Sequence, residues 1–574
     1  MAVNKKDVIK LLEKIAIYLE LKAENPFKIS AYRKAAQALE TDQRSLAEID
    51  DFTKIKGVGK GTATVITQFI ETESSETLEE LQKEVPEGLI PLLDLPGLGG
   101  KKLAKLYQEL NITNEQELKE ACEQGKVEEL SGFGKKTAEK ILQTLKDVNN
   151  RPDRLPLPLV VPVVKKIESY LAKSNDIEKF QVAGSFRRLR ETVKDLDFII
   201  ATNSPKKVRE YLLELDNITE VVSNGDTKVS IILKEKYPLG VDFRLVKVDE
   251  FYTTLHHFTG SKDHNVRLRQ LAKEQEKKIS EYGVEDLNTG KVETFTSEQA
   301  FFESFGLNYI PPEIREDDSE IEKAKDEISL IDRSMIRGDL HMHSTWSDGA
   351  ESIETMVQNA IEYEYEYIVI TDHSKFLRVA NGLNEERIKK QREEIDQLNE
   401  KYKDIHIFAG IEMDILPDGS LDFDDDVLKQ LDFVIASIHS SFNKNQAEIH
   451  HRLETALKNP YVDMIAHPTG RLLGKREGYN VDVEWLIDKA QKYNKILELN
   501  ANPNRLDLAS TWVRKAQEKG VRLAINTDAH NLEMLKDMDI GVKAGRRGWL
   551  KPENVINTWE ITKLQKYIEK NKRN

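Results

Sequence analysis

A chain of 574 residues is long enough for several domains, roughly three or four at the usual domain size. Its 39% hydrophobic and 32% charged residues are typical of a soluble globular protein, and we find neither a membrane-spanning apolar run nor a signal-peptide core. The net charge of −15 argues against non-specific wrapping of nucleic acid, and the single cysteine, Cys122, excludes an internal disulfide framework. We therefore expect a cytoplasmic protein.

The first 150 residues predict helices joined by glycine turns. Apolar residues recur at helical spacing from Val8 to Leu19. Further along, an apolar-x-Gly-x-Gly pattern followed closely by lysine occurs three times, and each copy leads into a predicted helix. Its glycines and lysines are Gly57, Gly59 and Lys60, then Gly97, Gly99 and Lys101, and finally Gly132, Gly134 and Lys135.

A Gly-x-Gly turn before a helix presents unpaired backbone amides and a positive dipole end to an anion. One copy alone would favour an ordinary turn between two helices. Three copies with lysines favour phosphate binding, and the pattern resembles the helix-hairpin-helix element, which grips DNA phosphates without reading sequence.

A proline-rich joint near residue 151 leads into a region with three aspartates on predicted strands. Asp195 and Asp197 stand two apart and so face the same side, and Asp242 lies in a second strand-like run. An Asp-x-Asp pair alone is common on solvated strands. Three convergent carboxylates, however, fit a two-metal site that stabilises the attacking and leaving oxygens of a phosphoryl transfer.

A Gly184-Ser185 pair stands ten residues before these aspartates, where an amide and a hydroxyl can hold a triphosphate, and Arg188 adds positive charge. Together with the Asp-x-Asp pair, Asp242 and the segment 258–261, this arrangement resembles the family X DNA polymerases. The N-terminal helical segment resembles that family's small domain for binding gaps and 5′ ends.

The resemblance implies a role for each matching residue. Asp195, Asp197 and Asp242 would be catalytic and hold two Mg²⁺ or Mn²⁺ ions, and Asp242 would assist deprotonation of the primer 3′-hydroxyl. The substrates implied are gapped or nicked duplex DNA and dNTPs. The implied nucleotide contacts are Gly184, Ser185, Arg188, His257, Phe258, Gly260, Asn265 and Arg269.

Three positions depart from the family pattern. Lys194 stands where members often carry glycine before the catalytic pair. His257 replaces a tyrosine that lines the sugar, which bears on discrimination against ribonucleotides. Val65 occupies the position of the Schiff-base lysine of lyase-competent members, and because amine catalysis needs that nitrogen, we predict no sugar-phosphate lyase activity through this position.

Beyond a charged linker at 316–335, β-rich runs alternate with helical stretches. Seven strand–helix repeats predict a parallel (β/α) barrel, whose active sites lie at the C-terminal strand ends. The strands are predicted at 337–343, 367–372, 405–411, 433–438, 462–466, 496–499 and 521–525.

Potential metal ligands recur at these strand ends. Nine of the twelve histidines lie between His341 and His530, and none precedes His256. Each ligand alone could be a capping carboxylate or a buried structural histidine, but their recurrence at most strand ends favours a metal centre. We expect the other three histidines of this part, at 406, 450 and 451, to be structural or on the surface. The nine candidates are His341, His343, Asp348, His373, Glu412, His439, His467, Asp528 and His530.

This set resembles the polymerase and histidinol phosphatase (PHP) domain, which implies up to three divalent metals such as Mn²⁺, Zn²⁺ or Fe²⁺. Asn500, Asn502 and Arg505 are candidate substrate contacts, with ordinary loop polarity as the alternative. The implied sites are His341, His343, Glu412 and Asp528; Asp348, His373 and His530; and His439 and His467 with Glu412 bridging.

A polymerase followed by this barrel resembles bacterial family X polymerases that carry a C-terminal PHP domain. The resemblance implies a monomeric gap-filling DNA polymerase for repair, with a Mn²⁺-dependent 3′–5′ exonuclease in the barrel. The alternatives are a small-metabolite phosphatase or a structural metal-binding module for the barrel, and a DNA-binding module with a vestigial transferase for the other half. The predicted parts are all-α helix-hairpin-helix domains at 1–85 and 86–150, an α+β nucleotidyltransferase palm at 151–248, a thumb at 249–315 and a distorted (β/α)7 barrel at 336–574.

Overall fold

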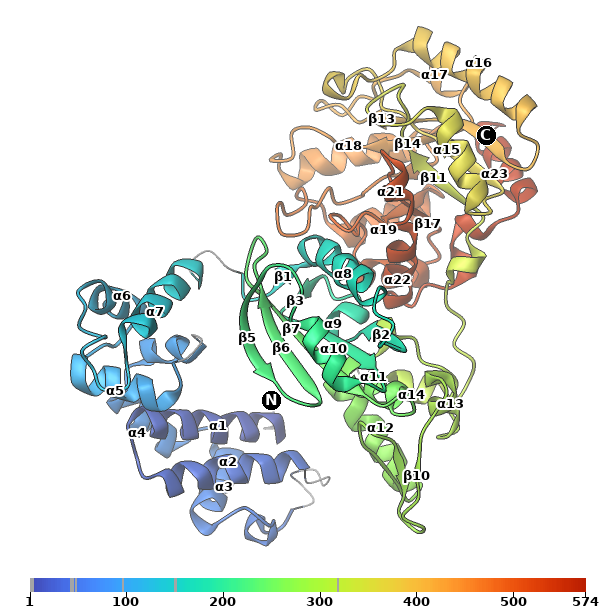
Figure 1. The fold of residues 1–574 in the computed structure, drawn as a ribbon. Helices are drawn as coiled ribbons and strands as arrows, with labels where there is room; N and C mark the ends of the chain where they lie inside the picture. The colour runs from blue at the N-terminus through green and yellow to red at the C-terminus, as the bar shows by residue number, and fades with distance from the viewer. Residues whose placement is uncertain are drawn as a thin grey trace. The chain divides into compact units, whose positions relative to one another are not determined.

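The computed structural model describes residues 5–41, 46, 49–94, 98–148, 152–316 and 319–573. The chain divides into two compact units, Met1–Asp153 and Arg154–Asn574 (Figure 1). Within the described ranges, no helix combines the length and the apolar character needed to cross a lipid bilayer.

The first unit is built from helices around one apolar core. Leu12, Ile15 and Leu19 of the first helix lie in this core, which explains the helical spacing of apolar residues there. The same core continues to Phe133 and Ile141. The helices are α1 (Lys5–Leu21), α2 (Pro26–Thr41), α3 (Lys60–Thr72), α4 (Glu76–Glu84), α5 (Gly100–Leu110), α6 (Glu115–Glu123) and α7 (Lys135–Val148).

The second unit begins with a five-stranded palm sheet in the order β2-β4-β7-β6-β5. Only the central pair β4–β7 of this sheet is parallel, and Phe198 and Phe243 stack between these two strands in the core. A short pair, β1 (Leu155–Pro156) and β3 (Thr192–Val193), lies apart from the sheet. The main elements are β2 (Lys179–Val182), β4 (Leu196–Ala201), β5 (Ile218–Asn224), β6 (Lys228–Leu233) and β7 (Leu239–Val246), with α8 (Leu157–Leu171), α9 (Gly184–Arg187) and α10 (Pro205–Leu212).

The thumb follows as a small α+β layer with an aromatic core. Phe301, Phe302 and Phe305 pack together, and the fully buried Arg315 lies over the Phe302 ring and pairs with Glu298 at 2.7 Å. Its elements are α11 (Phe251–Thr259), α12 (Lys262–Glu274), β8 (Lys277–Ile279), β9 (Val284–Asp286), β10 (Val292–Glu293), α13 (Glu298–Glu303) and α14 (Ser319–Lys323).

The C-terminal part is a parallel barrel of seven strands in chain order, β11 to β17. A bridge between Met342 and Ala529 brings the first strand to the segment after the last one. The predicted (β/α)7 fold class is therefore confirmed. The strands are β11 (Gly338–Met342), β12 (Tyr367–Ile370), β13 (His406–Asp414), β14 (Phe433–Ser437), β15 (Met464–Ile465), β16 (Ile496–Asn500) and β17 (Leu523–Asn526).

Helices alternate with these strands and cover them. Their apolar faces, such as Leu453 and Leu457, join the outer side of the strands in a continuous core. The helices are α15 (Ile353–Glu362), α16 (Glu385–Lys401), α17 (Asp425–Leu428), α18 (Gln446–Lys458), α19 (Val483–Lys492), α20 (Ser510–Glu518), α21 (Leu532–Leu535), α22 (Met538–Arg547) and α23 (Ile561–Arg573).

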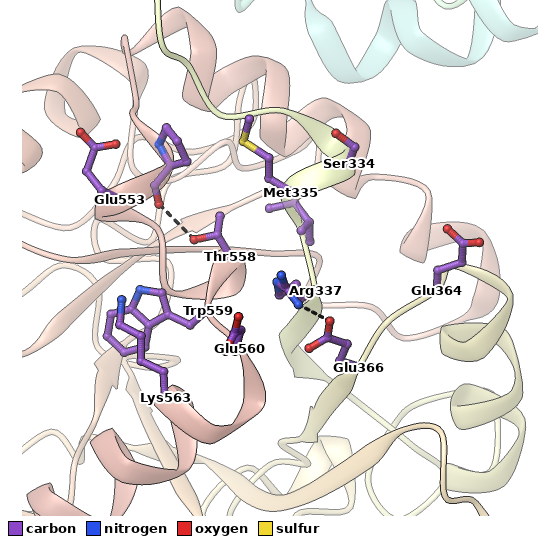
Figure 2. A pocket seen from close by; sticks show the side chains of 12 residues that line it. Ser334, Met335, Arg337, Glu364, Glu366, Glu553, Thr558, Trp559, Glu560 and Lys563 are labelled. Atoms are coloured by element: carbon purple, nitrogen blue, oxygen red, sulfur yellow. Dashed lines mark hydrogen bonds and ion pairs between the residues drawn. The ribbon is translucent and has the colours of Figure 1, made fainter.

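The two ends of the barrel differ in chemistry. A pocket of about 790 Å³ lies at the N-terminal strand ends, beside Trp559 and Lys563. It is lined by Arg337 and Glu366, which pair with each other just before β11 and β12 (Figure 2). This face of a (β/α) barrel usually serves stability. The candidate chemistry lies at the opposite ends of the strands.

Candidate functional site

All nine predicted ligands of the barrel come from the C-terminal ends of strands or the turns that follow them. Parallel strands bring these ends to one rim, so residues from 341 to 530 meet there. Six of them are buried, whereas Asp348 is exposed and His439 and His530 are half-buried. The buried ligands are His341, His343, His373, Glu412, His467 and Asp528.

Glu412 on β13 lies at the centre of this cluster. Its Oε1 is 2.9 Å from Nε2 of His467 and 3.2 Å from Nε2 of His439. Burial acts to raise the pKa of this carboxyl, but the charges of His439 and its other imidazole neighbours hold it well below its usual range. Its Oε2 faces three further imidazoles, at 2.9 Å from His373 Nδ1, 3.5 Å from His341 Nε2 and 3.6 Å from His343 Nε2.

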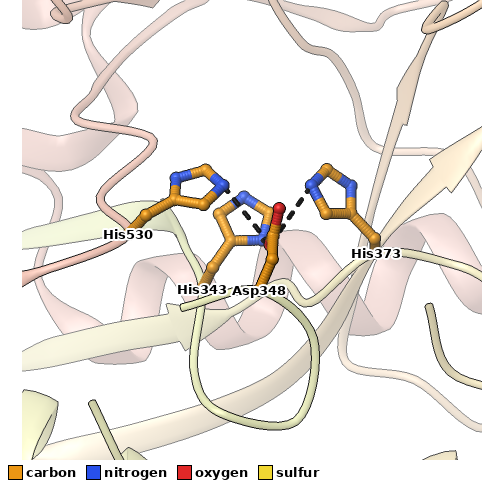
Figure 3. A group of neighbouring side chains, drawn as sticks. All are labelled: His343, Asp348, His373 and His530. Atoms are coloured by element: carbon orange, nitrogen blue, oxygen red, sulfur yellow. Dashed lines mark ion pairs between the residues drawn. The ribbon is translucent and has the colours of Figure 1, made fainter. Parts of the chain in front are cut away.

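Asp348 is the centre of a second group of predicted ligands, which Figure 3 shows. Its Oδ1 lies 3.5 Å from Nε2 of His530, 3.6 Å from Nε2 of His373 and 4.0 Å from Nδ1 of His343. The rings of His343 and His530 stack with their centroids 4.1 Å apart. Four donor atoms of these residues thus converge on one small volume.

Asp528 is the centre of a third group. Its Oδ1 is 3.2 Å from Nε2 of His343 and 3.5 Å from Nε2 of His341. Among the described residues, the donor atoms that converge form three groups. These groups share residues with the three implied sites, but each group has a different membership from the corresponding implied site. They are His343, Asp348, His373 and His530; His341, His343 and Asp528; and His373, Glu412 and His439.

The cluster has the donor set that a divalent metal needs. Nδ1 of His373 and Oε2 of Glu412 lie 2.9 Å apart, yet neither has a hydrogen-bond partner among the described residues. Nδ1 of His343 is likewise buried and has no hydrogen-bond partner among the described residues. Such buried polar atoms cost free energy when unsatisfied, and imidazole with carboxylate suits Mn²⁺, Zn²⁺ or Fe²⁺. The residues therefore fit a metal centre.

A buried carboxylate, Glu498, supports this rim and was not predicted from the sequence. Its Oε1 accepts a hydrogen bond from Nδ1 of His341 at 2.8 Å, and its Oε2 accepts the backbone N–H of His467 at 2.7 Å. Asp414 similarly lies 3.2 Å from Nδ1 of His439. The available signal was a glutamate in the middle of the apolar strand β16, where an ionised side chain needs partners.

The three predicted substrate contacts occupy different environments. Asn500 is fully buried, and its amide donates to Glu498 at 3.2 Å and Asp528 at 3.1 Å. Asn502 accepts the backbone N–H of residue 504 and so shapes the turn. Arg505 is half-buried, and its Nε lies 3.5 Å from Asp528. Of the three, Arg505 offers a cation at the edge of the rim.

The three palm aspartates lie together where the start of β4 pairs with the middle of β7. Asp197 and Asp242 are paired in register on these parallel strands, and Asp195 directly precedes β4. Burial, reinforced by the charges of Asp195 and Asp242, raises the pKa of Asp197 to about 7. Nζ of Lys228 lies 2.6 Å from Oδ2 of Asp242. The repulsion among these carboxylates would be relieved by divalent cations.

Gly184 allows the backbone of the predicted triphosphate segment to approach these aspartates. Its φ of +62° lies in the left-handed region, and a Cβ here would lie 2.6 Å from Oδ2 of Asp197. Oγ of the adjacent Ser185 accepts from Arg154 at 3.4 Å. Arg188 donates through Nε to Glu316 at 2.9 Å and through Nη1 to the carbonyl of residue 259.

The predicted nucleotide residues of the thumb also come together. Nδ2 of Asn265 donates to the carbonyl of His257 at 2.8 Å, and Nη2 of Arg269 lies 3.4 Å from Nδ1 of the same histidine. Phe258 lies under the guanidinium of a palm arginine at 4.6 Å. A Cβ at Gly260 would come within 3.2 Å of Nη1 of Arg188, so this turn abuts the triphosphate segment.

The glycine hairpins precede helices as the sequence predicts. Gly59 is the N-cap of α3, Gly99 is the N-cap of α5, and Gly134 directly precedes α7. Gly57 and Gly132 have φ of +111° and +90°, which only glycine adopts without strain. Lys60, Lys101 and Lys135 lie in the first turns of the three helices, while Gly97 lies outside the described residues.

Comparison with known protein families matches four segments. They are a helix-hairpin-helix domain at residues 3–75, a SAM-like helix-hairpin-helix tandem at 89–147, a DNA polymerase beta thumb at 254–316 and a PHP domain at 339–502.

Individual proteins match either part of the chain or nearly all of it. A probable phosphatase of Thermoanaerobacter sp. (strain X514) is 29% identical over 248 residues, which cover 41% of this chain and 95% of that protein. A probable phosphatase of Acetivibrio thermocellus is 28% identical over 243 residues. The DNA polymerase/3′-5′ exonuclease PolX of Bacillus subtilis (strain 168) is 58% identical over 568 residues, covering 99% of this chain and all of that protein. The chain therefore belongs to the PolX family, the family X DNA polymerases with a C-terminal PHP domain.

Proposed function

We propose that this chain is a DNA-dependent DNA polymerase that fills short gaps during repair, and that its barrel is a 3′–5′ exonuclease that prepares the 3′ end. The observation that carries the proposal is the presence of two separate carboxylate centres in one chain. One lies around Asp197 and Asp242 in the palm, and the other around Glu412 in the barrel. The PolX relative is named for both activities.

In the palm, Asp195, Asp197 and Asp242 would hold two Mg²⁺ or Mn²⁺ ions. When bound, these ions neutralise charge on the attacking and leaving oxygens of nucleotidyl transfer. Asp242 accepts the proton of the primer 3′-hydroxyl. The Gly184 segment lets backbone amides approach the triphosphate, and Arg188 pairs with its negative charge.

The thumb and the hairpins position the substrates. His257, Phe258, Gly260, Asn265 and Arg269 surround the sugar and base of the incoming dNTP. The hairpin amides and lysines of the first unit bind phosphates of gapped or nicked duplex DNA. We expect the protein to act as a monomer in the cytoplasm.

In the barrel, the nine ligands would hold up to three divalent ions, with Mn²⁺ as the ion for activity. When bound, the ions supply the Lewis-acid chemistry of phosphodiester hydrolysis. Glu412 would serve more than one of these sites, because both of its oxygens face imidazoles. Arg505 at the rim is placed to pair with a phosphate of the DNA end.

A second function for the barrel is hydrolysis of small phosphate esters. It is favoured by the probable phosphatase of Thermoanaerobacter sp., which matches over 95% of its own length and yet covers only 41% of this chain. This function predicts turnover of a free monoester such as histidinol phosphate and no shortening of DNA.

A 5′-labelled primer next to a one-nucleotide gap tests the proposal with Mn²⁺ present. The proposal predicts one-nucleotide extension with the matching dNTP and stepwise 3′ shortening without dNTPs. Histidinol phosphate in the same buffer should release little phosphate. Rapid phosphate release with an intact primer would favour the metabolite phosphatase.

A further inference from the structure

One carboxylate, Glu316 at the end of the thumb, joins the palm to the barrel. Its Oε1 accepts hydrogen bonds from Nε of Arg188 at 2.9 Å and Nη1 of Arg547 at 2.8 Å. Its Oε2 accepts from Nη1 of Arg190 at 2.9 Å. Arg547 is the last residue of the barrel helix α22, and its Nη1 also donates to the backbone carbonyl of Arg188 at 2.9 Å.

The charged side chains of this contact are largely buried, so leaving one of them without a partner would cost free energy. The side chains of Arg188, Glu316 and Arg547 are 14%, 24% and 17% exposed. Burial acts to raise the pKa of Glu316, but the hydrogen bond and charge of Arg547, together with Arg188, bring it below its ordinary value. Removing one partner from such a group leaves the remaining charges imperfectly compensated.

The palm and the barrel hold this contact in place with further interactions. Leu157, Val161 and Leu189 of the palm belong to the same buried apolar cluster as the barrel residues. Arg471 of the barrel pairs with both carboxylate oxygens of Glu191, at 2.7 and 3.2 Å. The interface therefore presents Arg547 to the nucleotide segment in a defined position.

We propose that Arg547 is a positioning residue for nucleotide binding in the palm. It neutralises Glu316 and fixes the backbone of Arg188, so that Arg188 keeps its positive charge available for an incoming triphosphate. Without Arg547, Glu316 would rely on Arg188 and Arg190 alone and would hold the guanidinium of Arg188, which already donates to it at 2.9 Å, more tightly. This inference rests on the proposed contact of Arg188 with the triphosphate.

Steady-state filling of a one-nucleotide gap by the full chain tests the inference. Arg547→Ala should raise KM for the dNTP about tenfold, the size of a partly buried charge contact, and change kcat less than about twofold. Adding Glu316→Gln should return KM to within about threefold of wild type, because the carboxylate that competes with the triphosphate for Arg188 is gone. Arg546→Ala, which removes a neighbouring cation that pairs with Asp332, is the matched control and should leave KM unchanged.

Two results would overturn the inference. One is an unchanged KM in Arg547→Ala, and the other is a raised KM that Glu316→Gln does not lower. If Arg547→Ala does not fold, Arg547→Lys serves instead. It keeps the charge but loses the planar guanidinium whose Nη1 contacts both Glu316 and the carbonyl of Arg188, and it should raise KM about threefold. Arg188→Ala is measured in parallel. If it leaves KM unchanged, the proposed contact of Arg188 fails, whereas a raised KM there with a normal Arg547→Ala sinks only the role of Arg547.

Discussion

Glu498 accepts a hydrogen bond from Nδ1 of His341 at 2.8 Å, and both side chains are fully buried beneath the rim of predicted metal ligands. A carboxylate behind an imidazole fixes the ring and makes its other nitrogen a better ligand. Because Glu498 also holds the backbone N–H of His467, one side chain positions two of the nine predicted ligands.

The first prediction concerns this supporting carboxylate. Glu498→Gln should weaken metal retention and slow the exonuclease by about 10–100-fold. The side-chain NH2 group of glutamine would face either the N–H of the His341 ring or the backbone N–H of His467, and that hydrogen bond would be lost. Gap filling should not change. Metal content after dialysis and 3′ shortening are the measurements, with the exposed Glu484→Gln as the control. Wild-type metal content and shortening rate in Glu498→Gln would contradict the supporting role.

The second prediction concerns the close approach of Gly184 to Asp197. Gly184→Ala places a Cβ 2.6 Å from a carboxylate oxygen and puts a side chain on a backbone with φ of +62°. Gap filling should fall at least about 100-fold, since a shift of about 1 Å at a reacting centre costs that much. Gly240→Ala is the control, because its Cβ meets only an ordinary contact at 3.7 Å. Equal activities of the two variants would remove the steric argument.

The free energy of unfolding is expected to depend on pH through Asp537. Burial raises the pKa of Asp537 to about 7, so the folded protein keeps a proton that the unfolded chain loses near pH 4. The free energy of unfolding therefore falls as pH rises from about 4 to 7 and stays reduced above it, by up to roughly 4 kcal/mol. Asp537→Asn should raise Tm over wild type more at pH 8 than at pH 5. The exposed Asp539→Asn is the control, and an equal Tm difference at both pH values would refute the prediction.

The fourth prediction concerns lyase chemistry. Val65 is buried in the core of the first unit on α3 and offers no nitrogen for a Schiff base. Borohydride should therefore trap little protein on DNA with an abasic 5′ end. Strong trapping that is lost in Lys60→Ala or Lys28→Ala would show that another lysine performs this chemistry.

The barrel could be predicted closely because its strands are buried on both faces and appear as apolar runs between helices. The strand predicted at 433–438, for example, is observed at Phe433–Ser437. The strand predicted at 462–466 is only Met464–Ile465 in the structure, because only these two residues pair with the neighbouring strands. The candidate metal ligands could be recognised in the sequence because they stand at the ends of predicted strands. Their grouping could not be predicted, since His343 and His373 each belong to two groups.

Other features depend on contacts between distant segments. Glu498 gains its role only when β16 lies beside β15 and β17, and the only local signal for it is a glutamate within an apolar strand. Arg547 meets the carbonyl of Arg188 across 359 positions of sequence. The domain boundaries and the roles of individual site residues stay predictions that activity measurements must test.

The central claim is that two independent centres in one chain extend and shorten DNA 3′ ends. A labelled gapped duplex, followed with and without dNTPs, tests it with Asp242→Ala and His341→Ala. Asp242→Ala should lose extension by at least roughly 1,000-fold and keep 3′ shortening, and His341→Ala should do the reverse, because each loses a metal contact worth several kcal/mol. Shortening that survives His341→Ala, or extension that survives Asp242→Ala, would contradict the account.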